Sequence, residues 1–156
     1  MSAAELWKTL SPETLTEDFV IEVLKDDLYF GNASKARDLQ ALHQAEIAAV
    51  VDVAYEESPA ALSRDIIYHR IPLIDGETND PTFVQAAILV TEQSLRLNLR
   101  TLVCCSAGMS RSPTIAVVAA ARFTGQKTDD VLTEVLEKTS LGIHPGFWNS
   151  AAAATP

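Results

Sequence analysis

The chain has 156 residues, 47% of them hydrophobic, and a formal net charge of −9 at pH 7. This length and apolar content suffice for one domain with a buried core. The negative charge and the scattered Lys and Arg residues argue against nucleic acid or a membrane surface as a partner, and no apolar run reaches the about 18 residues of a membrane-spanning helix.

The first predicted elements are a helix and a buried strand. Apolar side chains at three-residue spacing predict a helix over Ala33–His43, capped by Asn32 or Ser34. The short apolar run Ile47–Val53 is bounded by polar residues, which is typical of a buried strand in a parallel sheet.

The middle of the chain continues this alternation. Asp65–Ile71 is predicted to be a strand that Pro72 ends. Pro81–Leu97 places its apolar residues on one face, as an amphipathic helix does. The strand-like run Thr101–Val103 is followed by Thr114–Phe123, which is apolar on nearly all sides and therefore predicts a buried helix.

Two more helices, Thr128–Thr139 and Pro145–Ala153, complete the predicted elements. Only Ser11–Glu13 and Ala151–Pro156 are expected to lie outside the core. Strands that alternate with helices predict an α/β fold, with a mainly parallel central sheet flanked by helices on both faces.

The segment between the strand at 101–103 and the helix at 114–123 carries the clearest chemical signal. Cys105 and Arg111 are six positions apart, and Gly108 between them permits a positive φ and a close backbone approach. Ser112 and Pro113 fit an N-cap and the first helical position. A loop that ends at a helix N-terminus directs backbone N–H groups at one point, which suits a phosphate and would stabilise a cysteine thiolate.

A simpler interpretation remains open for the same residues. Cys105 could be a buried residue at the end of a core strand, and Arg111 an ordinary residue of the next helix. The strand, glycine, cap and proline all fall where a phosphate loop needs them, which favours a phosphate-binding loop that contains its own nucleophile.

This loop and its flanking segments resemble the cysteine-dependent protein tyrosine phosphatase superfamily, and most closely its dual-specificity phosphatase family. The resemblance extends from about Val20 to Trp148. Leu28–Ala33 resembles the opening strand of that family, Ile47–Val53 its next core strand, and Ile71–Asp75 the segment that ends at the catalytic acid.

The resemblance implies a role for each site residue. Cys105 would be the nucleophile, Arg111 the phosphate clamp, Asp75 the general acid and Ser112 the hydroxyl that helps the thiolate leave. The family usually has His before the nucleophile, where this chain has Cys104. The phosphate would be held by Arg111 and by the backbone amides of the loop, from Ser106, Ala107, Gly108, Met109, Ser110 and Arg111.

Asp75 has two interpretations. A carboxyl group on a mobile loop beside Gly76 can protonate a departing oxygen, and Asp75 precedes the nucleophile by about 30 residues. Asp-Gly is also a common solvated turn. The resemblance favours the acid, with Glu77 and Asp80 as the fallback candidates.

Other residues are given structural roles. The three histidines are too far apart along the chain for a metal site, so no metal is expected. No cofactor is expected either, because phosphocysteine chemistry needs none. Asp52 is expected to bond local backbone rather than support the loop, and Trp7 and Trp148 to be packing anchors. The histidines are His43, His69 and His144.

The resemblance predicts a metal-independent enzyme that hydrolyses phosphomonoesters through a phosphocysteine. The expected substrate is a phosphorylated protein or a small phosphomonoester, mainly phosphotyrosine, with phosphoserine and phosphothreonine as further substrates. Lipid and inositol phosphates are less expected, because the loop carries no Lys at Ala107, Met109 or Ser110. The alternatives are a phosphate-binding module without turnover and a thiol redox protein that uses Cys104 and Cys105.

The two cysteines are adjacent, which excludes a disulfide framework, and the N-terminus shows no secretion signal. We therefore expect a cytoplasmic protein. Residues 1–156 are expected to form a single phosphatase domain with its core at about 20–150 and with residues 1–19 packed on it.

Overall fold

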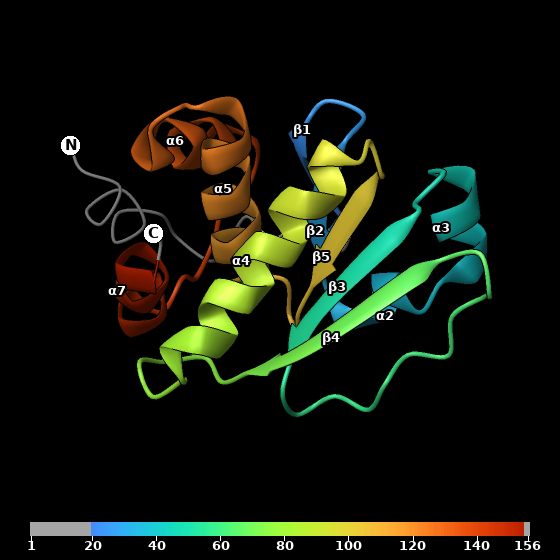
Figure 1. Ribbon diagram of the computed structural model, residues 1–156, viewed down its shortest axis with the longest axis horizontal. Helices are drawn as coiled ribbons and strands as arrows, with labels where there is room; N and C mark the ends of the chain where they lie inside the picture. The colour runs from blue at the N-terminus through green and yellow to red at the C-terminus, as the bar shows by residue number, and fades with distance from the viewer. Residues whose placement is uncertain (1–19, 155–156) are drawn as a thin grey trace.

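The computed structural model describes residues 20–154, and within them it confirms the predicted α/β fold (Figure 1). The central sheet has five strands in the order β1-β2-β5-β3-β4. All neighbouring pairs are parallel except β1 and β2, which are antiparallel. The strands are β1 (Ile21–Leu24), β2 (Leu28–Gly31), β3 (Ala49–Ala54), β4 (Ile67–Leu73) and β5 (Thr101–Cys104).

Helices cover both faces of the sheet because successive side chains of each central strand point to opposite faces. Val50 and Leu102 pack with the helices of one face, whereas Val51 and Val103 pack with those of the other. The first face is covered by α2 (Ala33–Ala36) and α3 (Leu39–Gln44). The second is covered by α4 (Pro81–Arg96), α5 (Arg111–Thr124), α6 (Thr128–Lys138) and α7 (Pro145–Ala154).

Several boundaries differ from the prediction. The helix predicted over 33–43 is two short helices, because Arg37 ends α2 and the side chain of Asp38 caps α3. The cap of α2 is Asn32, whose side chain accepts from the backbone N–H of Lys35 at 2.9 Å. Strand β1 was not predicted from the residue pattern.

Pro72 does not end its strand, so that prediction was wrong. Strand β4 continues to Leu73 at the edge of the sheet, where a residue without an N–H is tolerated. The register between β3 and β4 shifts just before Leu73, which fits an interruption of the ladder at the proline.

The C-terminal segment was also placed wrongly. Ala151 was expected to lie outside the core, but it is fully buried in α7, which extends to Ala154. Trp148 is buried in the same core cluster, as expected of a packing anchor. Trp7 and the segment Ser11–Glu13 lie outside the described residues, as do residues 155–156.

The topology brings four loops together at the end of the sheet where the parallel strands have their carboxyl ends. Cys104 pairs with both Gly31 and Asp52, and Ala54 pairs with Leu73. The segments that follow β2, β3, β4 and β5 lie beside one another there. In open α/β sheets, ligands bind at this end of the strands. Within residues 20–154, no helix combines the length and the apolar character needed to cross a membrane.

Candidate active site

The loop of residues 105–110 connects β5 to α5, and the segment after β2 holds it in place. The backbone N–H of Cys105 donates to the carbonyl of Gly31 at 3.3 Å, and that of Ala33 donates to the carbonyl of Ser106 at 3.1 Å. These bonds continue the pairing of β2 with β5 past the ends of the strands. The loop therefore begins in a position fixed by the sheet.

Gly108 adopts the conformation that its place in the sequence suggested. Its φ is +72°, in the left-handed region, and an added Cβ would lie 2.9 Å from the backbone nitrogen of Asn32 and from the carbonyl carbon of Gly31. Only glycine fits both the backbone angle and the close approach. The loop can therefore curl against the segment after β2.

The start of α5 differs from the prediction. The helix begins at Arg111 and its N-cap is Ser110, so Ser112 and Pro113 are the second and third helical residues rather than the cap and the first position. The loop still ends at the N-terminus of a 14-residue helix, which keeps the positive dipole end at the site.

Cys105 and Ser112 contact each other at the base of the loop. The thiol of Cys105 donates to the hydroxyl oxygen of Ser112 across 3.2 Å, and that hydroxyl donates to the carbonyl of Gly31 at 3.2 Å. Ser112 is fully buried and Cys105 is buried. A hydroxyl within reach of the sulfur can turn its proton toward a thiolate when one forms.

Arg111 is buried and paired with a carboxylate that the sequence reasoning missed. Its Nη1 donates to Oε2 of Glu56 at 2.8 Å, and its Nη2 donates to Oε1 of the same side chain. The hydroxyl of Ser106 also donates to Glu56. The hydrogen bonds from Arg111 lower the pKa of Glu56 to about 2, so its carboxylate is charged at neutral pH.

The hydrogen bonds of Arg111 leave one edge of its guanidinium for a ligand. A guanidinium has five N–H donors. Glu56 takes one from Nη1 and one from Nη2, and the carbonyl of Leu73 takes the other Nη1 donor at 2.8 Å. Within the described residues, Nε and the second Nη2 donor have no partner, and together they form an edge with the geometry to hold two oxygens of an anion side by side.

Glu56 had a weak signal in the sequence. It lies two residues after the end of β3, which neighbours β5 in the sheet. Glu56 is therefore at the same end of the parallel strands as the loop of residues 105–110, the predicted phosphate loop. Strand order was needed to use that signal, since Glu56 and Arg111 are 55 residues apart.

Asp75 lies on the loop after β4 and reaches the phosphate loop. Its Oδ1 accepts a hydrogen bond of 2.6 Å from the hydroxyl of Ser110. Asp75 and both fallback candidates are exposed. Asp80 caps α4 by accepting from the N–H of Thr82 at 2.9 Å, and the side chain of Glu77 makes no hydrogen bond or ion pair within the described residues. Asp75 is the carboxylate of this loop that contacts the segment of Cys105.

The neighbouring residue Cys104 has a different environment. Its side chain belongs to the core cluster on the opposite face of the sheet from that of Cys105. Burial, and then the nearby charge of Asp52, raise the pKa of Cys104 well above its usual value. Asp52 accepts from the backbone of Ala54 at 3.1 Å and from the hydroxyl of Tyr68 at 2.7 Å, so it bonds local backbone, as expected.

The three histidines lie apart in the structure. His43 contacts Ser63, His69 lies in β4, and His144 receives a hydrogen bond from the backbone of Gly146. Within residues 20–154, no three His, Cys, Asp or Glu side chains are grouped as metal ligands.

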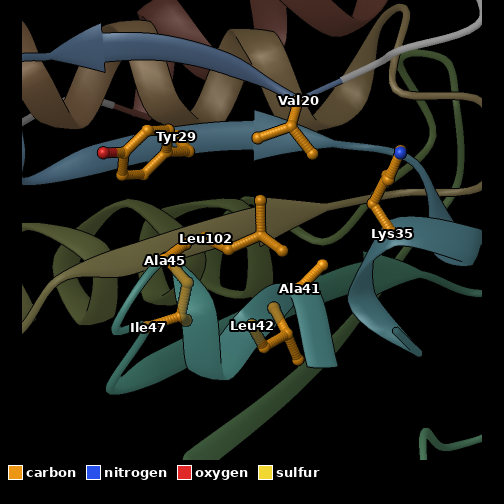
Figure 2. Close-up of a pocket in the computed structure, with 8 residues that line it drawn as sticks. All are labelled: Val20, Tyr29, Lys35, Ala41, Leu42, Ala45, Ile47 and Leu102. Atoms are coloured by element: carbon orange, nitrogen blue, oxygen red, sulfur yellow. The ribbon is translucent and has the colours of Figure 1, made fainter. Parts of the chain in front are cut away.

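A cavity of about 230 Å³ lies away from the loop, between α3 and the sheet (Figure 2). Its walls are mainly apolar and include Leu42, Ile47 and Leu102, with Tyr29 on the neighbouring strand. None of the residues around Cys105 lines it.

Comparison with known proteins finds similar chains among the protein phosphatases. No family model matches the sequence. The chain is 34% identical over 122 residues to human dual specificity protein phosphatase 15, a match that covers 77% of the chain and 41% of that relative. It is 31% identical over 106 residues to mouse dual specificity protein phosphatase 19, a match that covers 67% of the chain and 48% of that relative. The chain thus spans less than half of the length of these relatives.

Solved structures agree with the curated relatives. The fold matches the crystal structure of DUSP15 with a TM-score of 0.74 at 28% identity, over 87% of this chain and 90% of that one. The structural similarity therefore extends over most of the chain.

Proposed function

The chain belongs to the dual-specificity phosphatase family of the cysteine-dependent protein tyrosine phosphatases, and from this premise we propose that it hydrolyses phosphomonoesters through Cys105. The observation that carries the proposal is the loop of residues 105–110. It places the Cys105 sulfur 3.2 Å from the hydroxyl of Ser112, at the N-terminus of α5, beside a guanidinium that retains one edge of donors.

The first step transfers the phosphoryl group to the enzyme. The thiolate of Cys105 attacks phosphorus, a P–S bond forms, and the bond from phosphorus to the leaving oxygen breaks. Arg111 and the backbone amides of the loop hold the non-bridging oxygens. The carboxyl group of Asp75 gives its proton to the leaving oxygen, so that an alcohol or phenol departs.

The second step releases phosphate. The carboxylate of Asp75 takes a proton from water, the water oxygen bonds to phosphorus, and the P–S bond breaks. The departing thiolate of Cys105 accepts a hydrogen bond from Ser112 if that hydroxyl turns away from the carbonyl of Gly31, its partner in the structure. No metal ion takes part in this scheme.

The proposed substrate is phosphotyrosine in a protein, with phosphoserine and phosphothreonine as further substrates. The names of the curated relatives, dual specificity protein phosphatases, support this range. The uncharged side chains of Ala107 and Met109 in the loop offer no extra cation for an inositol phosphate.

The rival function is phosphate binding without turnover, because Cys104 replaces the histidine usual before the nucleophile. Two variants and one small aryl phosphate separate the two functions. Cys105→Ser should abolish hydrolysis but still bind vanadate, since the amides and Arg111 remain, whereas Cys104→Ser should keep most of the activity. A wild type that binds vanadate but does not hydrolyse the ester would favour the rival. Activity that survives in Cys105→Ser would exclude the proposed nucleophile.

A further inference from the structure

The hydroxyl of Ser110 joins three segments that are far apart in the sequence. It donates to Oδ1 of Asp75, on the loop after β4, at 2.6 Å. It accepts from the backbone N–H of His144, in the segment between α6 and α7, at 2.8 Å. Ser110 itself is buried in the phosphate loop.

The position of Ser110 in the helix explains why this hydroxyl is available. A serine at an N-cap usually accepts from the backbone N–H of the second or third helical residue. The third residue of α5 is Pro113, which has no N–H, and the side chain of Ser110 makes no capping bond to the second residue, Ser112, either. The hydroxyl is therefore used in tertiary contacts rather than local ones.

The contact with His144 also sets the direction of the Ser110 proton. A backbone N–H can only donate, so the oxygen of Ser110 must act as its acceptor. The single hydroxyl proton is then free to point at Asp75, as the distance of 2.6 Å indicates. The segment between α6 and α7 makes a second bond to the loop, from the N–H of Gly142 to the carbonyl of Met109 at 3.1 Å.

The loop that carries Asp75 is held from its other side by Asn79. The side-chain oxygen of Asn79 accepts from the N–H of Ile74 at 2.7 Å, and its nitrogen donates to the carbonyl of Ile74 at 2.6 Å. Gly76 has no positive φ in this conformation. The backbone beside Asp75 is thereby fixed, and the side chain depends on Ser110.

We propose that Ser110 is a positioning residue that holds the general acid against the phosphate loop before substrate arrives. This inference rests on the proposed function. Ser110 takes one carboxylate oxygen of Asp75, and the second, Oδ2, has no hydrogen-bond partner within the described residues. In the proposed reaction, that second oxygen delivers the proton to the leaving oxygen, while the hydroxyl of Ser110 fixes the direction of the carboxyl group.

The consequence is a dependence on the leaving group. A poor leaving group such as phenol needs its proton during P–O cleavage, whereas an activated phenol departs as its anion. General acids contribute about 10²–10⁴ to the rate, and we expect the loss of positioning to remove about tenfold of this for the poor leaving group.

The test compares kcat/KM for phenyl phosphate with that for p-nitrophenyl phosphate. In Ser110→Ala, the ratio of the nitrophenyl rate to the phenyl rate should rise about tenfold above the wild-type ratio. Ser110→Thr keeps the hydroxyl and should restore the wild-type ratio. The double variant Asp75→Asn with Ser110→Ala should have the same ratio as Asp75→Asn alone, because the group that Ser110 positions is then already absent. Ser94→Ala is the matched control, because Ser94 is a buried, hydrogen-bonded serine of α4.

The other outcomes are decisive too. If Ser110→Ala slows both esters by the same factor and weakens vanadate binding, the hydroxyl only shapes the phosphate loop and the inference is wrong. If Ser110→Ala does not fold, Ser110→Cys carries the same comparison with a weak donor of similar size. Failure of the proposed function is distinct, since it would appear as hydrolysis by Cys105→Ser or as a wild type without turnover.

Discussion

Glu56→Gln is the substitution that most directly tests the ion pair behind the phosphate clamp. Gln keeps the size of the side chain and one carbonyl acceptor, but it removes the charge that faces Arg111. The guanidinium side chain is only 8% exposed, so it would lose its counter-charge in a place that water hardly reaches.

The structure gives the size of the effect. The pKa of Glu56 is lowered from 4.5 to about 2. Each pKa unit corresponds to about 1.4 kcal/mol, so a shift of this size corresponds to roughly 3 kcal/mol of stabilisation of the folded state. Half of the Glu56 side chain is exposed, so solvent screening reduces that value to about 1 kcal/mol. The weakened hydrogen bonds of a buried cation add a cost of similar size, and we expect a total loss of about 2 kcal/mol in the free energy of unfolding.

The pH dependence has a definite sign. Because the pKa of Glu56 is lower in the folded state than in the unfolded state, its stabilisation is complete above pH 4.5 and is lost as the pH falls toward 2. The difference in unfolding free energy between wild type and Glu56→Gln should therefore be largest at neutral pH and should shrink at low pH.

Urea unfolding at pH 7 and pH 3, with kcat/KM for an aryl phosphate at neutral pH, measures these effects. We expect kcat/KM to fall about tenfold, because Arg111 loses part of its fixed orientation. Glu57→Gln is the matched control, since the side chain of Glu57 makes no hydrogen bond or ion pair within the described residues. Equal stability and equal activity of wild type and Glu56→Gln would refute the assignment of Glu56 as the partner that orients the clamp.

Four further predictions concern the loop and the residue that precedes it. Arg111→Lys should lower kcat/KM at least about 100-fold, because an ammonium group lacks the planar edge that binds two oxygens; a loss below tenfold in steady-state kinetics would mean a structural role. Gly108→Ala should destabilise the fold by roughly 2–5 kcal/mol in urea unfolding, since its Cβ would meet the backbone of Asn32 at 2.9 Å with φ at +72°, and a wild-type midpoint would contradict this. Iodoacetamide should label Cys105 before Cys104, whose burial raises its pKa, and phosphate should protect Cys105; mass spectrometry that finds equal, phosphate-independent labelling would remove the argument for an activated thiolate. Cys104→His should shift the pH at which Cys105 becomes reactive, and an unchanged labelling profile would show that this position does not tune the nucleophile.

Helix and strand periodicity predicted most of the fold because the apolar faces are long and regular. The helix expected over Pro81–Leu97 is α4 within one residue, and the strand expected over Thr101–Val103 is β5 within one residue. The pattern failed where a few local bonds decide the outcome. The side chain of Asp38 starts a second helix, and Pro72 stays in its strand because that strand lies at the edge of the sheet.

The sequence by itself determined the chemistry that lies in one continuous stretch. The spacing of Cys105 and Arg111, with Gly108 between them and a helix after them, predicts a phosphate loop without any knowledge of the strand order, although the segment after β2 also holds this loop in the fold. Contacts between distant segments were decided by the tertiary structure. Glu56 contacts Arg111, 55 residues away in the sequence, and Asp75 contacts Ser110, 35 residues away. These contacts form because the parallel strands bring the loops after β3, β4 and β5 to the same end of the sheet. Side-chain hydrogen bonds act over about 3 Å and leave no periodic trace in the sequence, so only the order of the strands could bring these partners together.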